Sequence, residues 1–133
     1  MKYIVFYVLA VFFSLSSHAQ GHRNDIVGKW LNDQENAHIE IYEKNGVFFG
    51  KIVWVDAPED LSDTGRRSTE GIMGMDIISD LVYAEGLWEH GTLYLPKKDR
   101  EVNCEASLSE DKKVLTLKIS KLWYTNSIKW TRL

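Results

Sequence analysis

Apolar and polar residues alternate over two neighbouring segments of the chain, 37–42 and 47–55, which are joined by Lys44-Asn45-Gly46. A period of two is typical of a strand with one buried face. Asn-Gly between such segments is the strongest short-range signal for a hairpin, because both central residues of a type I′ turn need positive φ. The pattern therefore predicts an antiparallel hairpin whose buried face carries Ile39, Ile52 and Trp54.

The rest of the chain repeats this pattern in short segments separated by turn residues. Further strands are predicted over 26–31, 87–88, 92–95, 102–108, 115–119 and 127–132. In 71–83 the apolar positions do not keep a clear period, and the pattern there allows a short helical turn near Ser79-Asp80. Eight or nine short strands with no long amphipathic helix predict an all-β domain, either a barrel or a sandwich.

Residues 56–70 form the one long break in the pattern. They contain five acidic residues, two arginines and a single large apolar residue, Leu61. A connection of this length is uncommon unless it is functional or disordered. We expect the most mobile segment of the protein here, with a lid over a binding site as one hypothesis. A calcium site is a weaker hypothesis, because the spacing does not match an EF-hand and Arg66-Arg67 could neutralise the acids.

The first nineteen residues differ from the rest. Lys2 gives a positive start, 4–15 is almost wholly apolar, and Ser17-His18-Ala19 is a small-x-small cleavage site. These features are typical of a secretory signal peptide, and the apolar run is shorter than the ~20 residues that cross a bilayer. We therefore expect residues 1–19 to be removed and residues 20–133 to form a single β-barrel domain, periplasmic or extracellular, without a membrane span.

The whole chain has a net charge of −3, and Lys2 is the only charged residue before Gln20, so the exported part is slightly more acidic. This acidity argues against nucleic acid or an anionic membrane as a partner, because both favour a basic surface. Cys104 is the only cysteine, so no internal disulfide can form. Its place in a strand pattern predicts a buried, unreactive thiol.

Gly28-x-Trp30 in the first strand and Trp130-x-Arg132 in the last favour a barrel over a sandwich. An up-and-down barrel closes by pairing its first strand with its last, which would place the Arg132 guanidinium over the Trp30 indole. In this feature the chain resembles the lipocalin-like (calycin) proteins, whose signature is a Gly-x-Trp strand with a basic residue of the last strand across it.

The chain resembles still more closely a family of secreted bacterial proteins catalogued as domain of unknown function 2147. The resemblance rests on residues 26–30, 37–42, 50–54 and 130–132. The chain departs from the family at 122–126, Leu-Trp-Tyr-Thr-Asn, where relatives commonly carry an Arg-Gly stretch. The resemblance implies a small lipocalin-like barrel and brings no known activity with it.

No catalytic or cofactor motif is recognisable, neither Gly-x-Ser-x-Gly nor His-Glu-x-x-His nor a glycine loop for phosphate or dinucleotide. His38 and Glu40 share a strand face and could form an acid–base pair, but ordinary outward-facing polar residues explain them better. His38 and His90 could both bind a metal, although no third ligand has a defined spacing to either. We therefore expect no cofactor and no metal, and lean against an enzyme.

The aromatic residues are more informative. Trp30 and Trp130, at the expected closed end of the barrel, fit core packing. Trp54, Trp88 and Tyr94 are predicted to line a ligand pocket, because their strand ends are expected to adjoin long loops. The preferred hypothesis is a secreted protein that binds a small apolar or amphipathic molecule. The alternatives are a structural or protein-interaction module with a solidly packed barrel and, more distantly, a hydrolase with an unrecognised site.

Overall fold

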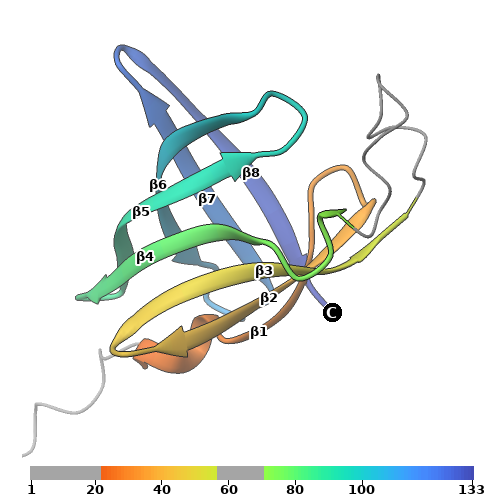
Figure 1. Ribbon diagram of the computed structural model, residues 1–133. Helices are drawn as coiled ribbons and strands as arrows, with labels where there is room; N and C mark the ends of the chain where they lie inside the picture. Colours follow the sequence, from red (N-terminus) through yellow and green to blue (C-terminus); the bar gives the residue numbers. More distant parts are fainter. Residues whose placement is uncertain (1–21, 57–70) are drawn as a thin grey trace, which may run out of the picture.

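Eight antiparallel strands form a closed barrel in the computed structural model, which describes residues 22–56 and 71–133 (Figure 1). Each strand pairs with its neighbours along the chain, and β8 pairs with β1. A 3₁₀ turn, η1 (Arg23–Ile26), precedes β1 (Gly28–Leu31), β2 (Ala37–Lys44), β3 (Val47–Val55), β4 (Asp76–Ala84), β5 (Leu87–Leu95), β6 (Arg100–Leu108), β7 (Val114–Lys121) and β8 (Tyr124–Arg132). The predicted all-β up-and-down barrel is confirmed. The predicted signal peptide and, apart from Asp56, the predicted mobile loop lie outside the described residues.

The barrel has two unlike ends. At the closed end, the turns β2–β3, β4–β5 and β6–β7 lie beside η1. The connections β1–β2, β5–β6 and β7–β8, which the structure describes in full, lie at the open end. Asn45 and Gly46 join β2 to β3 with φ angles of 56° and 85°, as a type I′ turn requires. Ile39 pairs with Ile52 across the two strands. The predicted hairpin is therefore confirmed.

Arg132 closes the barrel between β1 and β8. Its guanidinium carbon lies 4.2 Å from the centroid of the Trp30 ring. A β-carbon at Gly28 would lie 2.7 Å from Arg132 Nη1, and the φ of 143° at this position also favours glycine. The predicted neighbourhood of Trp30 and Arg132 is thus confirmed, and the same contact explains why residue 28 is glycine.

β4 runs as one strand although its apolar period is irregular. Its pairing with β3 shifts register twice, and Asp80 adopts a φ of 61°. The resulting bulges allow the consecutive residues Ile77 and Ile78 both to be buried. The helical turn considered near Ser79-Asp80 is therefore wrong, because the irregular period arises from bulges within a strand.

The closed half of the barrel interior is filled with large side chains. Five strands contribute Trp30, Phe48, Leu81, Trp88 and Leu115, all of them buried. Further along β3 and β5, towards the open end, the inward positions hold the smaller residues Gly50, Ile52, Gly91 and Leu93. Because side-chain volume falls along these strands, the interior is filled at one end only.

Candidate functional site

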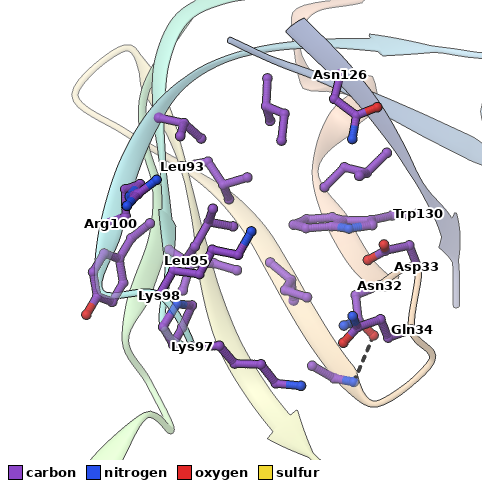
Figure 2. A pocket seen from close by; sticks show the side chains of 18 of the residues that line it. Asn32, Asp33, Gln34, Leu93, Leu95, Lys97, Lys98, Arg100, Asn126 and Trp130 are labelled. Carbon is purple, nitrogen blue, oxygen red and sulfur yellow. Dashed lines mark hydrogen bonds between the residues drawn. The ribbon is translucent and has the colours of Figure 1, made fainter. Parts of the chain in front are cut away.

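The open half of the barrel encloses a cavity of about 720 Å³ (Figure 2). Its walls are apolar side chains from β2 to β8: Ile39, Ile52, Ile77, Leu93, Val102, Ile119, Ile128 and Trp130. A volume of ~300–1,000 Å³ with mostly apolar walls is typical of sites for small molecules. The alternative of a solidly packed barrel does not fit this half of the molecule.

Cationic side chains stand at the opening of the cavity. They are Lys97 and Lys98 of the β5–β6 connection, Arg100 at the start of β6 and Lys121 at the end of β7. None of these four rim cations forms an ion pair with another described residue. Asp33 and Asp56 are the carboxylates among the described lining residues. Unpaired cations above apolar walls suit a molecule with an anionic end and an apolar body.

The β1–β2 connection forms a well-ordered part of the opening. Asn32 Oδ1 accepts hydrogen bonds from the backbone N–H groups of Asn36 and Ala37, both at 2.9 Å. Asn32 Nδ2 donates to Asn36 Oδ1 at 2.7 Å. These bonds satisfy backbone donors that a turn would otherwise leave unpaired. This side of the opening is therefore held in place before any ligand binds.

Trp130 lies where the packed and hollow halves of the barrel meet. Its indole reaches from β8 into the cavity (Figure 2), and only 3% of the residue is exposed. The buried Nε1 of this indole has no hydrogen-bond acceptor among the described residues. The Nε1 atoms of Trp30 and Trp88, by contrast, donate to the carbonyls of Ile26 and Arg23. Because an unpaired buried donor is costly, Trp130 is suited to donate to an oxygen atom of a ligand.

Of the three aromatic residues predicted to line a pocket, only Tyr94 borders this cavity. It lies near the end of β5 at the opening, and its hydroxyl donates to Asp99 Oδ1 at 2.6 Å. Its part in ligand binding stays a prediction, since no ligand contact tests it.

Trp54 lies outside the barrel, and its place on the buried face is corrected. It is 40% exposed, and its ring centroid is 4.4 Å from that of His38. His38 pairs with Trp54 whereas Ile39 pairs with Ile52, so Val53 is an extra residue in β3. This bulge shifts the alternation by one residue and turns Trp54 away from the cavity.

Trp88 lies in the packed half, and its predicted place in the pocket wall is also corrected. It is 2% exposed, its Nε1 donates to the Arg23 carbonyl at 3.1 Å, and its ring packs against Tyr83. β5 begins at the closed end beside the tight Glu85-Gly86 turn, so only its last residues reach the opening. The strand end beside Trp88 therefore adjoins a two-residue turn and not the long loop that was expected.

Two parts of the site are absent from the sequence-based prediction, namely the rim cations and Trp130. Lys97, Lys98 and Arg100 occur in what reads as an ordinary surface turn, and nothing in their spacing places them above a cavity. Trp130 was assigned to core packing. The period of two does place Ile128 and Trp130 on one face, which is the only sequence signal that links Trp130 to the cavity wall.

The described residues contain no group of three or more His, Cys, Asp or Glu side chains that could hold a metal ion. Cys104 is buried on β6, and burial raises the pKa of its thiol to about 12, in agreement with the predicted unreactive thiol. Among the described residues, the cavity offers apolar contact, the unpartnered buried Nε1 of Trp130 as a hydrogen-bond donor, and positive charge. These are means of binding a molecule and holding it in one orientation.

Fold and cavity together define the class: a lipocalin-like β-barrel that is packed at one end and hollow at the other. Residues 28–132 match the family described as "Uncharacterized protein conserved in bacteria (DUF2147)", and the chain belongs to that family. Protein HP1028 from the human pathogen Helicobacter pylori, described as belonging to the lipocalin family, is similar in structure. The TM-score is 0.64 at 18% identity, over 81% of this chain and 82% of that chain.

At this identity the likeness to HP1028 supports the fold alone. No curated protein matches the chain. Over the described ranges, the structure has no helix of the length and apolar character needed to cross a membrane.

Proposed function

We propose that the protein binds one small amphipathic molecule in the open half of the barrel without changing it chemically. The observation that carries the proposal is the cavity of about 720 Å³ with apolar walls and a cationic rim. Burial stabilises an apolar body by ~25 cal/mol per Å² removed from water. An acidic head group would remain at the opening, where Lys97, Lys98 and Arg100 can contact it. The likeness in fold to a lipocalin supports this proposal as an analogy.

The polar groups of the cavity stand at two depths, which narrows the ligand class. The rim cations lie at the opening, whereas the free Trp130 Nε1 lies at the boundary with the packed half. A ligand that used both would carry an anionic head and a second oxygen, such as an ester or hydroxyl, further along an apolar body. An acyl chain with such an oxygen has this chemistry.

We also propose that binding takes place after export. Lys2, the apolar run 4–15 and Ser17-His18-Ala19 support removal of residues 1–19. An exported binder of this kind would meet amphipathic molecules outside the cytoplasm.

Calorimetric titration with a panel of fatty acids and hydroxylated fatty acids, each beside its methyl ester, tests the proposal. The acid should bind more tightly than its ester, because only the acid can pair with the rim cations. The rim variant Lys97→Gln/Lys98→Gln/Arg100→Gln should weaken acid binding roughly 3–150-fold, since exposed charge pairs contribute ~0.2–1 kcal/mol each. The matched control Lys29→Gln/Lys118→Gln/Lys129→Gln removes three lysines from the outer wall and should bind as the parent does.

A cavity-filling variant separates the cavity from the rim. Ile128→Trp adds bulk to a half-buried wall position and should abolish binding of acid and ester alike. Failure of the whole panel to bind the parent protein would refute the proposal. Equal losses of acid and ester affinity in the rim variant would refute the assignment of the head group to the rim cations.

A further inference from the structure

The turn between β7 and β8 carries the two most exposed large apolar side chains of the described residues, and Tyr124 adjoins them. Leu122 is 84% exposed, Trp123 is 90% exposed and Tyr124 is 56% exposed. Lys121 pairs with Tyr124 as the last pair of the hairpin, so Leu122 and Trp123 form a two-residue turn. In Figure 1 this hairpin reaches beyond the neighbouring strands at the open end. We call residues 122–124 the hairpin tip.

The requirements of the turn do not explain these side chains. Leu122 has a φ of 56°, a left-handed conformation that a bulky residue adopts at a cost. The hairpin turns at the closed end, Asn45-Gly46 and Glu85-Gly86, each include a glycine with positive φ. Leu122 therefore opposes local backbone preference, and both Leu122 and Trp123 oppose solubility. Large apolar groups kept in such a position are typical of a contact surface.

The chemistry of the hairpin tip and its surroundings fits a lipid surface. Tryptophan and tyrosine are the side chains enriched where a membrane meets water, and leucine enters the acyl layer. Lys121 adjoins the hairpin tip, and Lys97, Lys98 and Arg100 stand around the same opening without ion pairs among the described residues. Cations near the membrane surface are attracted to anionic head groups.

A stable protein partner fits less well. Specific protein–protein interfaces bury ~1,200–2,000 Å² in total, more than three side chains at one turn can supply. Insertion into a bilayer surface requires only a few anchoring side chains with cations beside them. The acidic net charge of the whole chain had argued against an anionic membrane, but the described residues of the opening place four cations beside two carboxylates.

We propose that the hairpin tip inserts into the interfacial layer of a lipid bilayer with anionic head groups, with the rim cations at the head groups. The open end of the barrel then faces the membrane. If the proposed function also holds, an amphipathic ligand could pass between membrane and cavity without crossing bulk water. Docking itself does not depend on the cavity having a ligand.

Flotation of the protein with lipid vesicles tests this proposal. The probes are vesicles of phosphatidylglycerol mixed with phosphatidylcholine, and vesicles of phosphatidylcholine alone. The parent protein should float with the mixed vesicles more than with the neutral ones, and added salt should weaken the binding. Quenching of tryptophan emission by brominated lipids should reach Trp123, whereas Trp30, Trp88 and Trp130 are buried in the barrel.

The variant Leu122→Gly/Trp123→Asn places glycine at the left-handed position and a polar residue beside it, so it favours the turn while removing the apolar anchors. Its partition onto the mixed vesicles should fall roughly tenfold or more. Val82→Thr is the matched control, because Val82 is 41% exposed on β4, away from the hairpin tip, and this variant should float as the parent does.

Three outcomes would overturn the proposal. The first is a parent protein that floats with neither kind of vesicle, and the second is a tip variant that floats as well as the parent. The third is a dimeric parent and a monomeric tip variant in light scattering without flotation of either, which would assign the hairpin tip to a second copy of the chain. Leu122 and Trp123 also border the opening of the cavity, so the two proposals are kept apart on the parent protein. A parent that binds fatty acids in calorimetry but does not float with vesicles would refute docking alone.

Discussion

Closure of the barrel depends on the side chain of Arg132, and replacing this residue tests that dependence. Its guanidinium donates hydrogen bonds to the carbonyls of Val27 at 3.1 Å, Asp25 at 2.6 Å and Lys112 at 2.8 Å. It also lies 4.2 Å from the Trp30 ring centroid. One side chain thus connects η1, the turn between β6 and β7, and the two strands that close the sheet.

Arg132→Ala should lower the free energy of unfolding by about 2–4 kcal/mol. A cation–π contact contributes ~0.5–2 kcal/mol, and hydrogen bonds from a charged donor contribute ~1.5–3 kcal/mol each in protected sites. Water can reach part of this site and replace the lost bonds, so the expected total is well below the simple sum. For a domain of this size the melting temperature should fall by roughly 8–20 °C.

Urea titration of the parent, Arg132→Ala and Arg132→Lys measures this effect. Lysine keeps the charge over the Trp30 ring but cannot reach three carbonyls, so Arg132→Lys should recover less than half of the loss. Arg100→Ala is the control, because it removes an arginine at the opposite end and should leave the midpoint nearly unchanged. An Arg132→Ala protein within ~0.5 kcal/mol of the parent would show that closure does not depend on this side chain.

Three shorter predictions concern other parts of the chain. The Cys104 thiol, with its pKa raised to about 12 by burial, should resist an aromatic disulfide reagent at neutral pH and react once the protein is unfolded; rapid labelling of the native protein would contradict this. Partial burial alone would raise the pKa of Asp25, but its hydrogen bonds to Lys112 and to the His22 N–H hold it below the ordinary 3.8. A lowered carboxyl pKa stabilises the fold above the unfolded value and loses that effect as pH falls through the folded value, so Lys112→Ala should flatten the decline in urea midpoint below about pH 4. Intact mass of the protein from an exporting cell should correspond to a chain that starts at Gln20, and a retained Met1 would contradict the predicted cleavage.

The parts of the fold that follow from local chemistry could be predicted from the sequence. Asn45-Gly46 determines its own turn, because few other residue pairs adopt positive φ so readily. Gly28, Trp30 and Arg132 are a small set whose spacing has meaning only if the first and last strands pair. Closure of the sheet follows from this set, whereas the number of strands follows from the alternating segments separated by turn residues.

The site was harder to predict because it depends on register and direction. One extra residue, Val53, turns Trp54 to the outside. The sequence of β3 alone does not reveal this bulge, which becomes visible only when β3 is aligned with β2. Trp88 was placed at the wrong end of β5, since a pattern of alternation does not tell which loop lies beside which strand end. The rim cations come together only when the β5–β6 connection and the end of β7 meet around one opening.

The two ends of the barrel differ in how closely their residues follow local backbone and hydrogen-bonding preferences, and this difference supports the proposed binding site at the open end. Two of the three turns at the closed end include a glycine with positive φ, and the Nε1 atoms of Trp30 and Trp88 both have acceptors there. The open end has Leu122 with a φ of 56°, and among the described residues Trp130 Nε1 has no acceptor and the rim cations have no ion pairs. Features that lower stability persist where a binding surface needs them. Leu122→Gly/Trp123→Asn should therefore raise the free energy of unfolding by up to ~1 kcal/mol while it weakens vesicle binding, because it relieves a left-handed leucine. Urea titration beside flotation measures both effects on one protein, and a variant that loses stability together with binding would show that the hairpin tip serves the fold instead.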